Sequence, residues 1–244
     1  MFYFTFMFSF GGYGKKPLIL ERQFTTDSVF LLAHRGIGEY YPESSEGSLA
    51  AAHRIGFRAV EVDVEKTSDK QLIIFHDHDC LRLHGKEGNL DSLTLSYLQS
   101  FPLVFNGTES KDYARTPEEL VKKYHHKLIF YFDMKVKDLE SADQLVAVIK
   151  KYGIEKYSIL ANSHFPLIWY VEMKYPEITT ALEGFDKGKE WTYYLMPKDL
   201  KPDFLSSFAA TVDSAHVAWL KENDLLSRRI VYGVNGKTID SVLN

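Results

Sequence analysis

Carboxylates alternate with valines over residues 59–65, where the sequence reads Ala-Val-Glu-Val-Asp-Val-Glu. In a β-strand successive side chains point to opposite faces, so the three valines share one face and the three acids share the other. Like charges this close destabilise a fold unless water or a cation compensates them. Glu61 and Asp63 have the spacing of two oxygen ligands for one hard divalent cation. Taken alone, however, the pattern is more typical of an edge strand with a solvated polar face.

Three other apolar runs also end in charged or titratable residues, and this recurrence favours a site. The runs cover residues 29–33, 72–75 and 128–132, and they lead into His34 and Arg35, His76 and Asp77, and Asp133 and Lys135. The carboxyl ends of the strands in a parallel barrel open onto one rim, where such enzymes keep their active sites. We therefore predict that these side chains form one site.

The residue types in this set suit phosphodiester chemistry. Three carboxylates, Glu61, Asp63 and Asp133, are suitable ligands for Mg²⁺ or Ca²⁺, which neutralises a phosphoryl oxygen. Arg35 or Lys135 can stabilise the charge of the transition state, and two histidines can serve as general acid and general base. The alternatives are a zinc hydrolase built on residues 76–79, which read His-Asp-His-Asp, and a Lys135 that merely neutralises Asp133.

Several other titratable residues are expected to be structural. A lone histidine more often makes a structural hydrogen bond than a catalytic contact. This expectation applies to His78, His84, His125 and His126. Asp77 and Asp79 are expected to form turns.

The runs must be held by helices between them, and the predicted helices have recognisable ends. A helix over 47–55 can be capped by Ser44 or Ser45 and stopped by Gly56. Thr116, Pro117 and Glu119 have the pattern of a capping box at a helix start. Further helices are predicted at 94–101, 139–151, 165–174 and 217–226, and further strands at 157–160, 178–182, 209–212 and 229–234.

About eight strand candidates, most of them separated by helices, predict a parallel sheet covered on both faces. In 244 residues this pattern favours an α/β fold of the (β/α)8 TIM-barrel type over an open doubly wound sheet, because the first strand lacks a GxGxxG turn. We expect residues 1–28 to be an N-terminal extension and 29–244 a single barrel domain. The apolar residues 1–10 are too short to span a bilayer and lack a basic leader.

Composition bounds the class of protein. Hydrophobic residues make up 45% of the chain, which is enough for a substantial core, and the net charge is -4. This balance gives no electrostatic footprint for nucleic acid, and no segment approaches the length of an integral membrane helix. Cys80 is the only cysteine, so an intramolecular disulfide is excluded. The compartment, cytoplasmic or exported, and the oligomeric state stay open.

The motifs and their order resemble those of glycerophosphodiester phosphodiesterases. The resemblance covers residues 31–235 and is clearest over 31–135, with a matching Thr-Pro entry at residues 116–117. It rests on His34-Arg35-Gly36, Pro42-Glu43-Ser44-Ser45, Glu61-Val62-Asp63-Val64, Phe75-His76-Asp77 and Asp133-Met134-Lys135. Each motif is weak alone, but five in the right order are specific.

The resemblance implies a metal-dependent barrel that cleaves a small-molecule glycerophosphodiester to glycerol 3-phosphate and an alcohol. It implies that His34 and His76 are the acid–base pair, and that Glu61, Asp63 and Asp133 hold the metal. It assigns the substrate to four side chains: Arg35 and Lys135 at the phosphate, Glu43 at the metal or glycerol edge, and Tyr232 as a ring lining the pocket. A glycerol hydroxyl can attack first in such enzymes, giving a cyclic phosphate that water opens.

The chain departs from the family pattern at four places. Asp133 stands where the family usually has Glu, and Ser44 stands where it has Asn. The late Trp-Thr-Val-Asn motif reads Tyr-Gly-Val-Asn at residues 232–235, and the usual final Thr-Asp stretch is missing. These departures predict a shortened C-terminal end of the barrel, and they leave a catalytically weak barrel that binds phosphorylated headgroups as an alternative.

Overall fold

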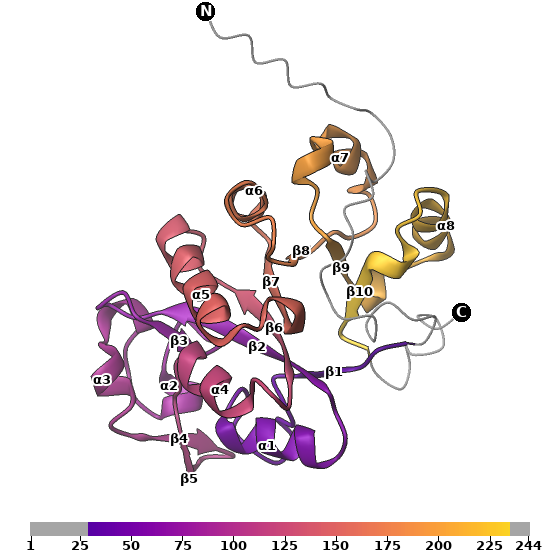
Figure 1. The fold of residues 1–244 in the computed structure, drawn as a ribbon. Helices are drawn as coiled ribbons and strands as arrows, with labels where there is room; N and C mark the ends of the chain where they lie inside the picture. Colours follow the sequence, from indigo (N-terminus) through magenta and orange to yellow (C-terminus); the bar gives the residue numbers. More distant parts are fainter. Residues whose placement is uncertain (1–28, 235–244) are drawn as a thin grey trace, which may run out of the picture. The chain divides into compact units, whose positions relative to one another are not determined.

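The computed structural model describes residues 29–234, which fall into two compact units (Figure 1). Residues 30–160 form the amino-terminal unit, and the described residues from Ala161 onward belong to the carboxyl-terminal unit. The predicted extension over 1–28 lies outside the described residues, and the prediction of a single barrel domain stays a prediction. Among the helices described over 29–234, none has the length and apolarity needed to cross a bilayer.

A parallel sheet forms the centre of the amino-terminal unit. Its strands, in spatial order, are β1 (Leu32–His34), β2 (Ala59–Lys66), β6 (Ile129–Met134) and β7 (Ser158–Asn162), whose last two residues belong to the carboxyl-terminal unit. The acidic strand is β2, and it lies between β1 and β6, so the edge-strand alternative is wrong. The three valines of β2 are completely buried, as the alternation predicted.

The third apolar run is not a parallel strand of the barrel, and this prediction is wrong. It forms β3 (Leu72–Ile74), which pairs antiparallel with β2, so that Ile74 lies opposite Val64. The physical reason is the length of the connection, because five residues can close a hairpin but cannot make the crossover that parallel strands need. The hairpin returns the chain beside β2, where the backbone N–H of Phe75 donates to the Asp63 carbonyl at 3.1 Å.

The helices of this unit begin and end where their capping residues predicted. Helix α1 (Glu46–Arg54) has Ser45 as its N-cap, with the hydroxyl accepting from the Ser48 N–H at 3.1 Å. Helix α4 (Pro117–Tyr124) has the predicted capping box between Thr116 and Glu119. Helix α5 (Leu139–Tyr152) ends at Gly153, whose φ of 63° is the left-handed conformation that glycine adopts easily.

Residues 76–115 contain more regular structure than the sequence predicted. The elements are α2 (Leu81–His84), a 3₁₀ turn η2 (Leu90–Ser92), α3 (Leu95–Leu98), and a hairpin of β4 (Pro102–Phe105) and β5 (Thr108–Tyr113). The missed signal is Asn106-Gly107, a strong hairpin-turn dipeptide, and both residues have positive φ. These elements share a small apolar core made of Ile73, Phe75, Cys80, Leu83, Leu90, Leu98, Leu103 and Ala114.

The carboxyl-terminal unit repeats the strand–helix alternation. Its parallel strands are β8 (Thr180–Leu182), β9 (Phe204–Phe208) and β10 (Arg229–Tyr232). Its α-helices are α6 (Phe165–Lys174), α7 (Glu190–Leu195) and α8 (Ser214–Glu222), and its 3₁₀ turns are η4 (Lys198–Leu200), η5 (Ala209–Thr211) and η6 (Leu226–Arg228). A further 3₁₀ turn, η3 (Glu155–Tyr157), precedes β7 in the amino-terminal unit.

The strand predicted at 209–212 is wrong, because β9 ends at Phe208 and a 3₁₀ turn follows. Two serines in the middle of β9 concealed its buried character. Ser206 and Ser207 are almost fully buried, and the Ser207 hydroxyl donates to the Phe185 carbonyl at 2.7 Å. A buried hydroxyl that finds a backbone partner fits inside a sheet without the apolar signal of a strand.

Candidate active site

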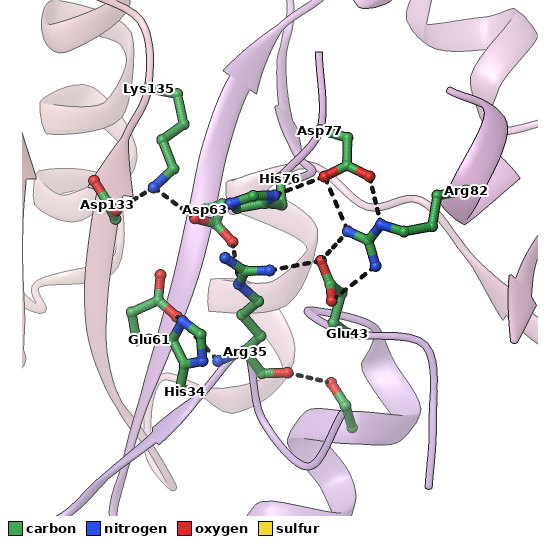
Figure 2. A network of polar contacts seen from close by, with 11 residues as sticks. His34, Arg35, Glu43, Glu61, Asp63, His76, Asp77, Arg82, Asp133 and Lys135 are labelled. Atoms are coloured by element: carbon green, nitrogen blue, oxygen red, sulfur yellow. Dashed lines mark hydrogen bonds and ion pairs between the residues drawn. The ribbon is translucent and has the colours of Figure 1, made fainter. Parts of the chain in front are cut away.

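Strand register places the predicted acids beside one another. His34 on β1 lies opposite Glu61 on β2, and Asp63 on β2 lies opposite Asp133 on β6. Because side chains alternate along a strand, Glu61 and Asp63 lie on the same face of the sheet. Lys135 follows Asp133 by two residues and joins this face (Figure 2). Parallel pairing therefore gathers these five side chains, as the sequence predicted.

Glu61, Asp63 and Asp133 form a compact acidic cluster within the amino-terminal unit. Each offers a carboxylate oxygen, and these oxygens lie within 4.8 Å of one another. Burial, followed by the charges of the other two acids, raises the pKa of Glu61 well above its usual value. Burial also raises the pKa of Asp133, against the opposing effect of Lys135. Three crowded carboxylates of this kind need positive charge beside them.

Two cations of the chain provide part of that charge. Arg35 Nε lies 3.0 Å from Asp63 Oδ2, and Lys135 Nζ lies 2.9 Å from Asp63 Oδ1 and also contacts Asp133. These contacts with Asp63 have the distances of ion pairs, but its two buried oxygens accept no well-formed side-chain hydrogen bond from residues 29–234. A buried carboxylate with unused lone pairs, beside two further acids, fits the ligand set of a hard divalent cation.

A tight turn fixes Arg35 at the end of β1. Arg35 has a φ of 54° and Gly36 a φ of 71°, and the Arg35 N–H donates to Glu61 Oε2 at 2.9 Å. The hydroxyl of Ser48 donates to the Arg35 carbonyl at 3.1 Å. A β-carbon on Gly36 would lie only 2.7 Å from the Ser48 backbone, so no other residue fits there without movement. This explains the glycine of the His-Arg-Gly motif.

The two predicted catalytic histidines have different surroundings. His34 Nε2 lies 3.8 Å from Glu61 Oε2, and 68% of the His34 side chain is exposed. Partial desolvation, and then the charge of Arg35, lower the pKa of His34. His76 is less exposed, and its Nδ1 lies 2.7 Å from Asp77 Oδ1.

A second cluster consists of Glu43, His76 and Asp77, and an arginine that the sequence analysis missed connects it. Arg82 contacts both carboxylates, and Arg35 Nη1 donates to Glu43 Oε1 at 3.0 Å (Figure 2). Hydrogen bonding to Arg82 lowers the pKa of Asp77 to about 2. Burial opposes ionisation of Glu43, but Arg82 and Arg35 outweigh it and lower its pKa.

The sequence could have indicated Arg82 only through its position, because it follows the Phe-His-Asp motif by five residues. Asp77 is therefore more than the turn former that we expected. Asp79 does form a turn, accepting from the Leu81 N–H at 3.0 Å.

The zinc alternative depended on four consecutive residues acting as one cluster. His78 instead lies 3.8 Å from Asp91 and is 61% exposed. Neither His78 nor Asp79 belongs to a group of potential metal ligands within residues 29–234. Of the histidines expected to be structural, His84 is buried with its Nε2 2.6 Å from the Leu98 carbonyl.

Tyr232 lies on β10 in the carboxyl-terminal unit, where its ring centroid is 5.6 Å from that of Phe208. The predicted role of Tyr232 in substrate binding stays a prediction.

Comparison with known proteins identifies the family. Residues 34–182 match the glycerophosphoryl diester phosphodiesterase family. Among curated proteins, YhdW of Bacillus subtilis is 24% identical over 162 residues, covering 63% of this chain and 65% of its own. Mouse glycerophosphodiester phosphodiesterase 1 is 28% identical over 142 residues, covering 56% of this chain and 42% of its own. The chain therefore spans less than two thirds of the length of these two relatives.

Solved structures show the same fold. A phosphodiesterase of Oleispira antarctica, solved with the product sn-glycerol-3-phosphate, has a TM-score of 0.75 at 19% identity, with 88% of this chain and 87% of that chain covered. A glycerophosphodiester phosphodiesterase of Agrobacterium tumefaciens has a TM-score of 0.72 at 15% identity, with 88% and 91% covered. The predicted α/β fold of the (β/α)8 type is confirmed. The chain belongs to the glycerophosphoryl diester phosphodiesterase family.

Proposed function

We propose that the protein is a metal-dependent phosphodiesterase that hydrolyses glycerophosphodiesters to glycerol 3-phosphate and an alcohol. The observation that carries the proposal is the meeting of Glu61, Asp63 and Asp133 within 4.8 Å, with a histidine directly opposite Glu61 in the strand register. Family membership supports the reaction class, and the Oleispira relative was solved with glycerol 3-phosphate as its product.

The metal is proposed to be Mg²⁺ or Ca²⁺, held by Glu61, Asp63 and Asp133. When bound, such a cation supplies positive charge to a phosphoryl oxygen and orients it. Carboxylates are hard oxygen ligands, and three of them with water suit either ion. The unused lone pairs of Asp63, buried between two other acids, support this assignment.

His34 and His76 are proposed to be the acid–base pair. In hydrolysis, an oxygen of water or of a glycerol hydroxyl forms a bond to phosphorus, and the bond from phosphorus to the headgroup oxygen breaks. One histidine takes the proton of the attacking oxygen, and the other gives a proton to the departing alcohol. If a glycerol hydroxyl attacks first, water then opens the cyclic phosphate by the same exchange. The Asp77 carboxylate beside Nδ1 of His76 favours a proton there and leaves Nε2 for the exchange.

The substrate is proposed to meet four further side chains. Arg35 and Lys135 contact the phosphate and stabilise its charge, and Glu43 lies at the glycerol edge. Arg35 and Lys135 are part-buried beside Asp63, so both reach the acidic cluster. Tyr232 is proposed to line the pocket.

The proposal is tested by measuring release of glycerol 3-phosphate from glycerophosphocholine with Mg²⁺ or Ca²⁺. The wild type should turn over, and His34→Ala and His76→Asn should each lose at least about 100-fold in kcat. His53→Ala is the matched control, because His53 is an exposed histidine in the last turn of α1. If wild type and His34→Ala are equally slow, the enzyme proposal is wrong, and binding of phosphorylated headgroups without turnover becomes the better account.

A further inference from the structure

Arg82 joins two segments of the candidate site that are far apart in the sequence. We propose that Arg82 is a positioning residue, which holds Asp77 and Glu43 and through them fixes the His76 ring and the Arg35 side chain. This inference rests on the proposed phosphodiesterase function. In this proposal Arg82 itself does not contact the substrate.

The guanidinium of Arg82 engages both carboxylates twice. Its Nε and Nη2 donate to Asp77 Oδ2 and Oδ1 at 2.6 and 3.0 Å. Its Nη1 and Nη2 donate to Glu43 Oε2 and Oε1 at 3.0 and 2.6 Å (Figure 2). Paired N–H···O bonds of this kind fix the orientation as well as the distance of a carboxylate, and they require the planar fork of arginine.

Each of the two oriented carboxylates contacts, and so orients, a proposed functional residue. Asp77 Oδ1 also faces His76 Nδ1 at 2.7 Å, so the orientation of Asp77 sets the orientation and tautomer of the ring. Glu43 Oε1 also accepts from Arg35 Nη1 at 3.0 Å, and Arg35 in turn pairs with Asp63. The guanidinium of Arg82 therefore orients both a proposed acid–base group and a proposed phosphate-binding group through the two carboxylates.

The backbone that carries Arg82 is well anchored, although the side chain is half exposed. Helix α2 directs Leu83 into the small apolar core, and His84 is buried with its ring nitrogen against the Leu98 carbonyl. The Cys80 N–H donates to the Gly88 carbonyl at 2.9 Å. A fork on a rigid element can orient its partners, whereas a fork on a free loop would follow them.

Without Arg82, Glu43 and Asp77 would be two carboxylates with ligand atoms within 4.8 Å of each other. They would repel each other, and Asp77 could turn away from His76. A lysine at position 82 would restore the charge but not the two paired contacts. Charge and geometry can therefore be separated by substitution.

The experiment compares Arg82→Gln and Arg82→Lys with wild type, using glycerophosphocholine and saturating Mg²⁺. Arg54→Gln is the matched control, because Arg54 is an exposed arginine of α1 with one 3.4 Å contact to the Tyr41 hydroxyl. We expect kcat to fall about 10- to 100-fold in Arg82→Gln and at least about 5-fold in Arg82→Lys, while KM changes by less than about 3-fold. The Mg²⁺ midpoint should not change, since Arg82 contacts none of the three proposed ligands.

Nitrogen NMR of the His76 imidazole provides a readout that does not depend on turnover. The signals are assigned with His76→Asn, and Arg82→Gln should shift them toward a mixture of tautomers. Unchanged His76 signals, or full kcat in Arg82→Lys, would overturn the proposal. If Arg82→Gln does not fold, Arg82→Lys decides by the same two criteria. A wild type that releases no glycerol 3-phosphate would refute the proposed function, and the His76 spectra would still decide whether Arg82 positions the ring.

Discussion

Lys135 sits where positive charge is most needed, and its removal should have opposite effects on folding and on metal binding. Lys135→Met leaves Arg35 as the remaining cation close to Glu61, Asp63 and Asp133 among residues 29–234. Two unit charges at the 2.9 Å separation of Lys135 and Asp63 attract by about 6 kcal/mol at an effective dielectric constant of 20. Partial exposure of the ammonium, and proton uptake by acids whose pKa is already raised, reduce the net loss to roughly 2 kcal/mol.

For a chain of this size, the metal-free protein should therefore melt roughly 4–8 °C lower. Metal affinity should move in the other direction, because a bound divalent cation no longer meets the repulsion of the ammonium. We expect the Kd for Mg²⁺ or Ca²⁺ to tighten at least about 10-fold, which corresponds to about 1.4 kcal/mol. Turnover should nevertheless fall, since Lys135 is a proposed phosphate contact.

Scanning calorimetry in EDTA and titration calorimetry with the metal measure the two effects separately. Lys66→Met is the matched control, because Lys66, at the end of a strand of the same sheet, also pairs with a carboxylate, that of Asp138 at 2.5 Å. It should lose some stability without any change in metal affinity. If Lys135→Met binds the metal no more tightly than Lys66→Met, the ammonium does not compete with the cation, and the reasoning fails.

Three further outcomes are expected. The pKa of Asp77 is depressed from 3.8 to about 2, so its ionisation adds roughly 2 kcal/mol to the free energy of unfolding above about pH 4, and this contribution is lost as the pH falls toward 2. The unfolding free energies of wild type and Asp77→Asn, measured in urea, should therefore converge near pH 2. Gly36→Ala should lower the free energy of unfolding, measured by chemical denaturation, by more than about 2 kcal/mol. Gly107→Ala should lower it by only about 1 kcal/mol, because a β-carbon there meets no described atom within 4 Å. Asp133→Glu should tighten Mg²⁺ binding several-fold in titration calorimetry because it restores one methylene of reach; weaker binding would mean that the strands are spaced for the shorter acid.

The acidic half of the site could be predicted because it depends only on strand periodicity. Alternation placed Glu61 and Asp63 on one face, and parallel pairing then put Asp133 opposite Asp63. The helix ends were equally readable, since capping depends on a few adjacent residues. The predictions that failed concern short segments whose structure is decided by tertiary packing. The strand β9 was missed because Ser206 and Ser207 are buried by tertiary packing and so carry no apolar signal.

Arg82 could not be predicted because its partners are set by the tertiary fold. Its link to Glu43 crosses 39 positions, and no period or spacing in the sequence connects them. The hairpin at Asn106-Gly107 could have been predicted, since that dipeptide favours the backbone of tight turns.

The two histidines come beside the acidic strand by different physical routes, and this explains why the wrong direction predicted for β3 did not separate the predicted side chains. His34 ends a parallel strand, so its position follows from the pairing of β1 with β2. His76 ends an antiparallel strand, and it returns beside Asp63 because the hairpin after β2 is short. The convergence prediction assumed that all four runs are parallel strands, whose carboxyl ends share one rim of a barrel. The antiparallel β3 nevertheless ends beside Asp63, because it pairs only with the last three residues of β2. The chain then continues from Phe75 into the small apolar core. His76 therefore needs a link back to the residues around Arg35, and the paired contacts of Arg82 with Asp77 and Glu43 supply it.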